Sequence, residues 1–290
     1  MKRLFGFIVL SASLVACGGG ESASNTTTTV VVQTTVPETI QASGQRSGLP
    51  TRAAQKKLLT LRFWVASTDG RFEDTTRQAV MAFQKYFRLK PTGSITPGTA
   101  YLLETVDEPA TAETTEGTLA EVDKQRQLLF IVQEGKTVAV LNASTGDDRE
   151  YEEPDANSPG VIIRGVALTP EGTFAIDRER PDGWWIGDLG QIYRPKYFIG
   201  GVAIHGSTSV PAYPASRLCA CQCSRDGHDL GQRPASTWDD GHRPLGSACL
   251  VPGSNLQTPV VGIHAGTIRR PELPPVQGAH HILTFDHSEL

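Results

Sequence analysis

The spacing of apolar residues changes twice along this chain, and these changes constrain the fold more than any other feature. Between Leu49 and Val106 the apolar residues recur at helical intervals, whereas from Thr118 they gather in short runs typical of strands. From Arg217 onward no period is sustained. The sequence therefore predicts an α+β multidomain protein, in which a small helical unit precedes a mainly-β unit and a disordered or poorly packed tail.

Composition excludes several classes of protein. A chain of 290 residues is longer than one average domain, and 39% apolar residues suffice to build a core. A net charge of -4 gives no general basic surface, which argues against nucleic acid as a partner. No stretch reaches the roughly 18 to 20 apolar residues that span a bilayer, so a multipass membrane protein is excluded.

The N-terminus has the order of an export signal. Two basic residues precede an apolar stretch from Leu4 to Val15, and a Leu-Val-Ala sequence leads directly into Cys17. This junction resembles the lipobox of bacterial lipoproteins, which implies a signal peptide over residues 1–16 and a lipid anchor on Cys17. The alternative is an ordinary signal peptide, or a short N-terminal anchor, in which this cysteine is incidental.

Two segments have the composition of linkers. Residues 17–49 are polar and of low complexity, with a tract of four threonines, and we expect them to form a flexible tether. No packed core is expected before about residue 50 on this interpretation. Residues 107–117 are rich in Thr, Glu and Ala, and we expect them to separate two folded units.

Residues 50–106 are predicted to form three short helices. The first has an apolar face that includes Leu58, and the second places Val80, Phe83 and Phe87 at i, i+3 and i+7. A third helix is expected to begin at Thr96-Pro97, where a capping residue is followed by proline. These features predict a small domain packed around a few aromatic side chains.

The order of turn, cap and aromatic residues in this segment resembles the peptidoglycan-binding type 1 repeat. The residues that carry the resemblance are Gln55-x-x-Leu58, Phe63-Trp64, Asp69-Gly70-x-Phe72, Thr76-x-x-Ala79-Val80-x-x-Phe83-Gln84 and Pro91-Thr92-Gly93. The resemblance implies that this domain binds the glycan strands of peptidoglycan. The alternative, from the apolar pattern alone, is a generic three-helix spacer.

Residues 118–216 are predicted to form a mainly-β unit with short loops. Apolar runs at 128–132 and 137–142 flank a Gln-Glu-Gly-Lys turn, which indicates a hairpin. Further strand-like runs follow at 161–163 and 172–176.

This unit resembles the L,D-transpeptidase catalytic domain, also called the YkuD fold, which is of β-sandwich type. The residues that carry the resemblance are Asp123-x-x-x-Gln127-Leu128, Ser144-Thr145-Gly146, Thr169-Pro170-x-Gly172-x-Phe174, Tyr197-Phe198 and Gly201-Val202-Ala203-Ile204-His205-Gly206. In that family the histidine of the last motif is followed by a Ser-His-Gly-Cys string that ends in the nucleophile. By position, the nucleophile here is Cys219.

The resemblance implies acyl transfer through a cysteine, without a cofactor. His205 would act as general base and support a thiolate on Cys219, while the backbone at Gly206 would orient the histidine. The thiolate would attack the amide between the third and fourth residues of a peptidoglycan stem peptide. An amine on a neighbouring stem would then accept the acyl group and close a crosslink.

The family motif breaks immediately before the cysteine. The chain reads Ser216-Arg217-Leu218-Cys219, so that Arg and Leu stand where the family has His and Gly. With GC-rich codons, reading one nucleotide later from Arg217 produces Gly-Cys-Ala-Arg-Val-Ser-Ala-Arg, which resembles the family's continuation. We therefore interpret residues 217–290 as an out-of-frame tail and the catalytic domain as truncated at residue 216.

Loss of the native continuation predicts an impaired enzyme. The missing segment would supply a covering helix and a closing strand, so neighbouring strands are expected to lose hydrogen-bonding partners. The leading hypothesis is an exported, lipid-anchored L,D-transpeptidase whose activity is reduced or absent. The competing hypothesis is a non-catalytic peptidoglycan-binding lipoprotein.

The cysteines and histidines of the tail offer a third hypothesis, a metal-dependent wall hydrolase. Thiolate and imidazole are the ligands that zinc prefers, and the tail holds Cys219, Cys221, Cys223, His228 and His242. Their spacing is not that of a standard zinc knuckle, and the frameshift accounts for the same residues. No metal site is therefore predicted.

Overall fold

The computed structural model describes residues 38–180, 183–215, 219–222 and 260–266. The predicted signal peptide, Cys17 and most of the predicted tether lie outside these described residues. Within the described ranges, no helix has both the length and the apolar character needed to cross a membrane.

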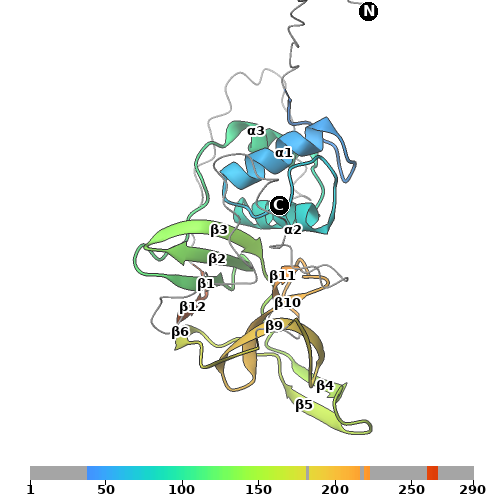
Figure 1. The fold of residues 1–290 in the computed structure, drawn as a ribbon, viewed down its shortest axis with the longest axis vertical. Helices are drawn as coiled ribbons and strands as arrows, with labels where there is room; N and C mark the ends of the chain where they lie inside the picture. Colours follow the sequence, from blue (N-terminus) through green and yellow to red (C-terminus); the bar gives the residue numbers. More distant parts are fainter. Residues whose placement is uncertain (1–37, 181–182, 216–218, 223–259, 267–290) are drawn as a thin grey trace, which may run out of the picture. The chain divides into compact units, whose positions relative to one another are not determined.

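The described N-terminal part forms three helices, as predicted (Figure 1). They are α1 (Leu49–Thr60), α2 (Asp74–Tyr86) and α3 (Pro97–Thr105). The hydroxyl of Thr96 accepts a hydrogen bond of 3.2 Å from the backbone amide of Thr99, which caps α3. Phe83 is fully buried at the centre of this part, where its ring meets that of Phe63 edge to face at a centroid distance of 5.3 Å.

The last part of the predicted tether is packed against the helices. Glu38 forms ion pairs with Arg52 and with Lys56, the latter at 3.2 Å. Gly44 pairs with Ile95 through two backbone hydrogen bonds of 2.9 and 3.0 Å. Among the described residues, packed structure is therefore present from Glu38, about twelve residues before the start that composition alone indicates, because backbone pairing and ion pairs hold this polar segment against the helices.

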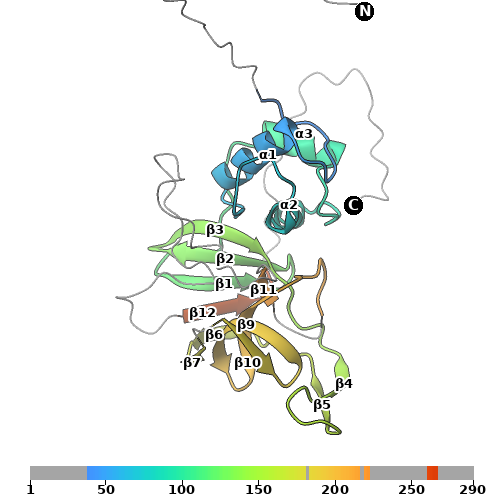
Figure 2. The same ribbon diagram turned by 45° about the vertical axis from the view of Figure 1, so that its right-hand side comes forward.

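The described strands form two larger sheets and a hairpin (Figures 1 and 2). One sheet has the order β3-β2-β1-β12-β6, the other has the order β11-β10-β9-β7 with β8 also paired to β9, and β4 pairs with β5. The bounds are β1 (Leu119–Asp123), β2 (Leu128–Gln133), β3 (Lys136–Asn142), β4 (Glu150–Pro154), β5 (Ile162–Val166), β6 (Gly172–Ala175), β7 (Arg178–Glu179), β8 (Trp184–Gly187), β9 (Gly190–Ile199), β10 (Val202–Ser207), β11 (Cys219–Gln222) and β12 (Val260–His264). The predicted fold class, three helices followed by a mainly-β part, is confirmed.

The helices and the first sheet share one hydrophobic core. A single cluster of buried side chains joins Phe63, Phe83 and Tyr86 to Phe130 of β2 and Val140 of β3. The backbone continues the contact, since the amide of Val140 donates to the carbonyl of Arg62 at 2.7 Å.

The segment expected to be a separating linker is itself tied down. Within residues 107–117, Ala110 is buried, and the amide of Ala112 donates to the hydroxyl of Thr137 at 2.7 Å. The amides of Glu113 and Thr114 both donate to the carboxylate of Glu121, each at 2.8 Å. The helical part and the first sheet therefore pack against each other. Composition alone assigns their apolar faces to two separate cores, but in the structure these faces are in contact.

Two short pieces of the tail form strands. β12 pairs parallel with β1 and antiparallel with β6, and β11 pairs parallel with β10. The sequence alone predicts that the strands before residue 217 lack such partners, and the observed pairing of β1, β6 and β10 differs from this prediction. The run Val-Val-Gly-Ile at the start of β12 accounts for the pairing of this strand, because the apolar side chains of Val261 and Ile263 are buried.

Candidate active site

His205 lies on β10 and is buried, with 6% of its surface exposed. Its Nδ1 atom is 2.9 Å from the carbonyl oxygen of Gly206. Because a carbonyl oxygen only accepts hydrogen bonds, this contact requires a proton on Nδ1, so that the neutral form of this imidazole has its lone pair on Nε2. A neutral histidine in this tautomer has the form that a general base requires.

The backbone brings Cys219 beside His205. Residues 205 and 219 are partners in the parallel pairing of β10 with β11, and the register shifts between His205 and Gly206. Residues 216–218, which hold the departure from the family motif, lie outside the described residues. His205 and Cys219, which the order of the family motifs assigns to one site, are thus neighbours in the sheet.

A pocket of about 560 Å³ opens beside His205. Its walls come from the β4–β5 hairpin, from the segment 166–169, and from β7, β8, β9 and β10. The side chains that face it include Tyr151, Thr169, Arg178, Trp185 and Tyr197. A pocket of this size accommodates a peptide of a few residues.

The quoted motifs around residues 127, 145 and 169 support the wall of this pocket. Gln127 and Thr145 exchange two hydrogen bonds, of 2.6 and 2.7 Å. The amide of Gly146 donates to the hydroxyl of Thr169 at 2.9 Å, and a side chain on residue 146 would lie 1.9 Å from the carbonyl oxygen of Ala167. A glycine is therefore required where these two segments cross.

The same segment holds the chain that leads toward Cys219. The hydroxyl of Ser144 donates to the carbonyl of Tyr213 at 2.9 Å, and the amide of Ala215 donates to the carbonyl of Thr145 at 2.9 Å. The Ser144-Thr145-Gly146 motif thus links the pocket wall to residues 213–215.

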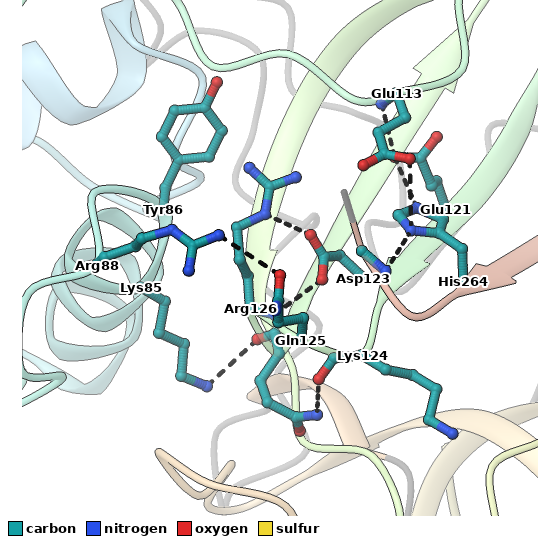
Figure 3. Close-up of polar contacts among 12 residues, drawn as sticks. Lys85, Tyr86, Arg88, Glu113, Glu121, Asp123, Lys124, Gln125, Arg126 and His264 are labelled. Carbon is teal, nitrogen blue, oxygen red and sulfur yellow. Dashed lines mark hydrogen bonds and ion pairs between the residues drawn. The ribbon is translucent and has the colours of Figure 1, made fainter. Parts of the chain in front are cut away.

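Polar contacts from α2 reach residues next to the ends of β2 and β3 (Figure 3). The ammonium group of Lys85 is buried and donates to the carbonyls of Gln127 and Ala143, at 3.2 and 2.9 Å. Burial lowers the pKa of Lys85 to about 7. The guanidinium of Arg126 lies 5.2 Å from the ring centroid of Tyr86 and also pairs with Asp123.

A second buried charge lies in the middle of β1 (Figure 3). Glu121 is fully buried, and the imidazole of His264 on β12 approaches it to 3.3 Å. Burial alone would raise the pKa of Glu121, but contacts from His264, Thr114 and Glu113 outweigh it and lower that pKa to about 2. The contact with Glu121 raises the pKa of His264.

Comparison with known proteins decides the family. A peptidoglycan binding domain profile matches residues 47–103, and an L,D-transpeptidase catalytic domain profile matches residues 117–220. The crystal structure of an L,D-transpeptidase from Xylanimonas cellulosilytica is 30% identical, covers 79% of this chain and 98% of that chain, and superposes with a TM-score of 0.58. The chain belongs to the L,D-transpeptidase family.

A second crystal structure, an L,D-transpeptidase from Stackebrandtia nassauensis, is 16% identical, with 79% of this chain and 97% of that chain covered and a TM-score of 0.37. No curated protein matches the chain. Both matched domains are named for peptidoglycan or for its crosslinking enzymes, which indicates a protein that faces the cell wall.

Several pocket residues of this L,D-transpeptidase domain were not singled out in the sequence. Arg178, Arg180 and Trp185 all line the pocket with His205. Their signal is weak because exposed arginines near a turn are common on protein surfaces. Three of the tail residues considered as zinc ligands, Cys223, His228 and His242, lie outside the described residues, within which no cluster of metal-binding side chains occurs.

Proposed function

We propose that this chain is an exported peptidoglycan L,D-transpeptidase in which Cys219 is the nucleophile and His205 is the general base. The observation that carries the proposal is the pairing of residues 205 and 219 on neighbouring strands, at the edge of a pocket that His205 lines. The contact of Nδ1 with the carbonyl of Gly206 supports the histidine's role, since it leaves Nε2 as the basic atom.

The reaction proceeds in two acyl transfers. Nε2 of His205 takes the thiol proton, and the thiolate attacks the carbonyl carbon between the third and fourth stem residues, forming a carbon–sulfur bond. The carbon–nitrogen bond breaks, and the leaving amine takes the proton from the imidazolium. An acceptor amine then attacks the thioester carbon and forms a new carbon–nitrogen bond, while the carbon–sulfur bond breaks. The proton of the amine passes through His205 to the released thiolate, and the crosslink is formed.

A covalent adduct tests this chemistry. Incubation of the full chain with a stem tetrapeptide or a carbapenem, followed by mass spectrometry of its peptides, is expected to show the acyl group on Cys219. The adduct should disappear in His205→Ala, whereas Ser209→Ala, on the exposed segment between the two residues, should retain it. An adduct on another residue, or one that persists in His205→Ala, would refute the assigned roles.

We further propose that the activity of this chain is reduced because Arg217 and Leu218 replace His and Gly before the nucleophile. Resequencing of the gene across the codons for residues 215–223 tests the frameshift that we infer. Two additional nucleotides would restore Ser-His-Gly-Cys and an ordinary family member. An unchanged sequence would favour the alternative function, a non-catalytic peptidoglycan-binding lipoprotein that acts through the helical domain of residues 50–106.

The lipid anchor on Cys17 is also a proposal, supported by the Leu-Val-Ala sequence before that cysteine. In cells that express the chain, a labelled fatty acid is expected to appear on the protein, and the protein should fractionate with membranes. Cys17→Ser should lose both properties. Retention of the label by this variant would refute lipidation at Cys17 and favour the ordinary signal peptide.

A further inference from the structure

Two arginines face the pocket that His205 lines. Arg178 lies on β7 and lines this pocket, and Arg180, two residues further along the chain, lines it too. Residues separated by two in an extended chain point to the same side, which accounts for their shared orientation. Both are exposed, so their guanidinium groups are accessible from the pocket.

Each guanidinium rests on an aromatic ring. The central carbon of Arg178 lies 4.0 Å from the ring centroid of Tyr197, and that of Arg180 lies 4.8 Å from the ring centroid of Trp185. Stacking of this kind limits the rotation of the side chain while its N–H groups remain available at the edge of the plane. The two groups are therefore held in place before any ligand binds.

The charge of the pocket is not balanced. Among the described residues, neither arginine lies within ion-pair distance of a carboxylate, although Arg164 and Lys196 nearby are paired with Glu152 and Glu179. Asp188 is the one acidic residue among the described lining residues, and its carboxylate accepts a hydrogen bond of 3.0 Å from Asn157. The lining thus carries an excess of positive charge beside the candidate general base.

The proposed substrate carries a negative charge next to the bond that is cut. The scissile amide joins the third and fourth residues of a tetrapeptide, so the terminal carboxylate belongs to the residue that leaves. This carboxylate therefore lies only one residue from the bond that is cut. Guanidinium groups pair with carboxylates in a planar geometry.

We propose that Arg178 and Arg180 form a carboxylate subsite that recognises the free C-terminus of the acyl-donor peptide. This inference rests on the function proposed above and names the residues that would hold the terminal carboxylate of the donor peptide in this pocket. Arg178 and Arg180 are specificity residues, since they contact the leaving residue and not the thiol.

Binding of two matched peptides to the full chain tests the subsite. The probes are a stem tetrapeptide with a free C-terminus and the same peptide with a C-terminal carboxamide, each titrated by calorimetry at low and high salt. We expect the carboxamide to bind about tenfold more weakly, as for loss of a charge-assisted pair, and we expect the difference to shrink at high salt. Arg178→Gln combined with Arg180→Gln should abolish the preference.

Three further variants make the result specific. Arg164→Gln removes an equal charge from an exposed residue of β5 that does not line this pocket, and it should keep the preference. Arg178→Lys and Arg180→Lys should keep part of it, because they retain the charge and lose the planar fork. The lysine variants also provide the test if the double glutamine variant fails to fold.

The outcomes separate this inference from the proposed function. Equal binding of the two peptides by the natural chain, or a preference that survives in the double glutamine variant, refutes the subsite and leaves stem-peptide binding intact. If the natural chain binds neither peptide, the proposed donor substrate is wrong and the subsite is wrong with it.

Discussion

Two regions of the molecule differ in how they are built. One is the junction between α2 and the first sheet, and the other is the pocket beside His205. At the junction, the five leading residues of β2 are all buried, and buried aromatic rings from the helices meet Phe130. Around the pocket, β4 and β5 alternate between exposed and half-buried residues, and Val166, Leu168 and Ile186 each expose more than half of their surface. One region is closed on all sides, and the other leaves apolar surface uncovered.

The difference shows where this protein concentrates its stability. Buried apolar area dominates the free energy of folding, so the junction holds the helical part and the sheet together. Exposed apolar side chains around a pocket contribute little to folding and remain available to a ligand. The helical part and the first sheet thereby share one buried core, while the open apolar surface lies at the pocket beside His205.

The largest expected effect comes from removing a ring at the junction. Phe83→Ala should lower the free energy of unfolding by about 3 to 5 kcal/mol, because it leaves a cavity in the shared core. Val166→Ala, at a position that is 53% exposed on β5, should change it by less than about 0.5 kcal/mol. Urea denaturation measures both.

Cooperativity provides a second readout of the same variant. If the helices and the sheet form one unit, fluorescence and circular dichroism should report the same transition in the natural chain. Two separate transitions, or a loss confined to the helical signal in Phe83→Ala, would contradict a shared core.

Lys85 gives the next largest effect, and it depends on pH. Its pKa is about 7 in the folded protein against an ordinary value of 10.5, so between these values the unfolded chain binds more protons. Folding is therefore penalised fully below about pH 7, and stability should rise between about pH 7 and 10 by up to about 1 kcal/mol per pH unit from this group. Denaturation over this range measures the slope.

A variant assigns that slope to the residue. Lys85→Met keeps the length of the side chain and removes the titrating group, so the rise should be absent. Lys56→Met, at an exposed position of α1, serves as the matched control and should retain the rise. An equal slope in both variants would place its origin elsewhere.

Local patterns predicted the elements well and their assembly less well. The period of residues such as Val80 and Phe83 identified α2, and the turn at 133–136 identified the β2–β3 hairpin, because both signals depend on neighbours in sequence. The shared core escaped prediction because an apolar face does not specify which partner covers it. The order of family motifs anticipated that residues 205 and 219 are neighbours, whereas Arg178 and Arg180 carried no pattern that distinguishes them from other exposed arginines.

A smaller effect is expected where the two regions are connected. The amide of Gln78 on α2 donates to the carbonyl of Val210 at 3.2 Å and accepts from Asn142 at 2.6 Å, so it links the junction to the chain after His205. Gln78→Leu should cost about 1 to 2 kcal/mol, because two buried polar groups lose a partner. Hydrogen exchange should also quicken at residues 207–210.

The matched control is Gln45→Leu, which removes an exposed amide that bonds to Ser94 within the helical part. It should leave both stability and exchange at residues 207–210 unchanged within about 0.5 kcal/mol. Unaltered exchange in Gln78→Leu would mean that the helical part does not restrain the segment that follows the histidine.

The smallest expected effect concerns the pair of Glu121 on β1 and His264 on β12. The pKa of His264 is raised from 6.5, so its contribution is complete below about pH 6.5 and is lost as pH rises through the higher folded value. The pKa of Glu121 is lowered from 4.5 to about 2, so its contribution is complete above about pH 4.5 and is lost as pH falls toward 2. Their joint stabilisation is therefore greatest between these limits.

His264→Gln should cost about 0.5 to 1 kcal/mol at pH 5.5 and less at pH 8.5, since the natural pair is weakened at the higher pH. Thermal unfolding at the two values measures this difference. A loss that is equal at both values, or larger at pH 8.5, would show that His264 acts by packing and not by charge. The effect stays small because the imidazole of His264 is 28% exposed, so solvent screens its interaction with Glu121. The ring of Phe83 at the junction, in contrast, is fully buried.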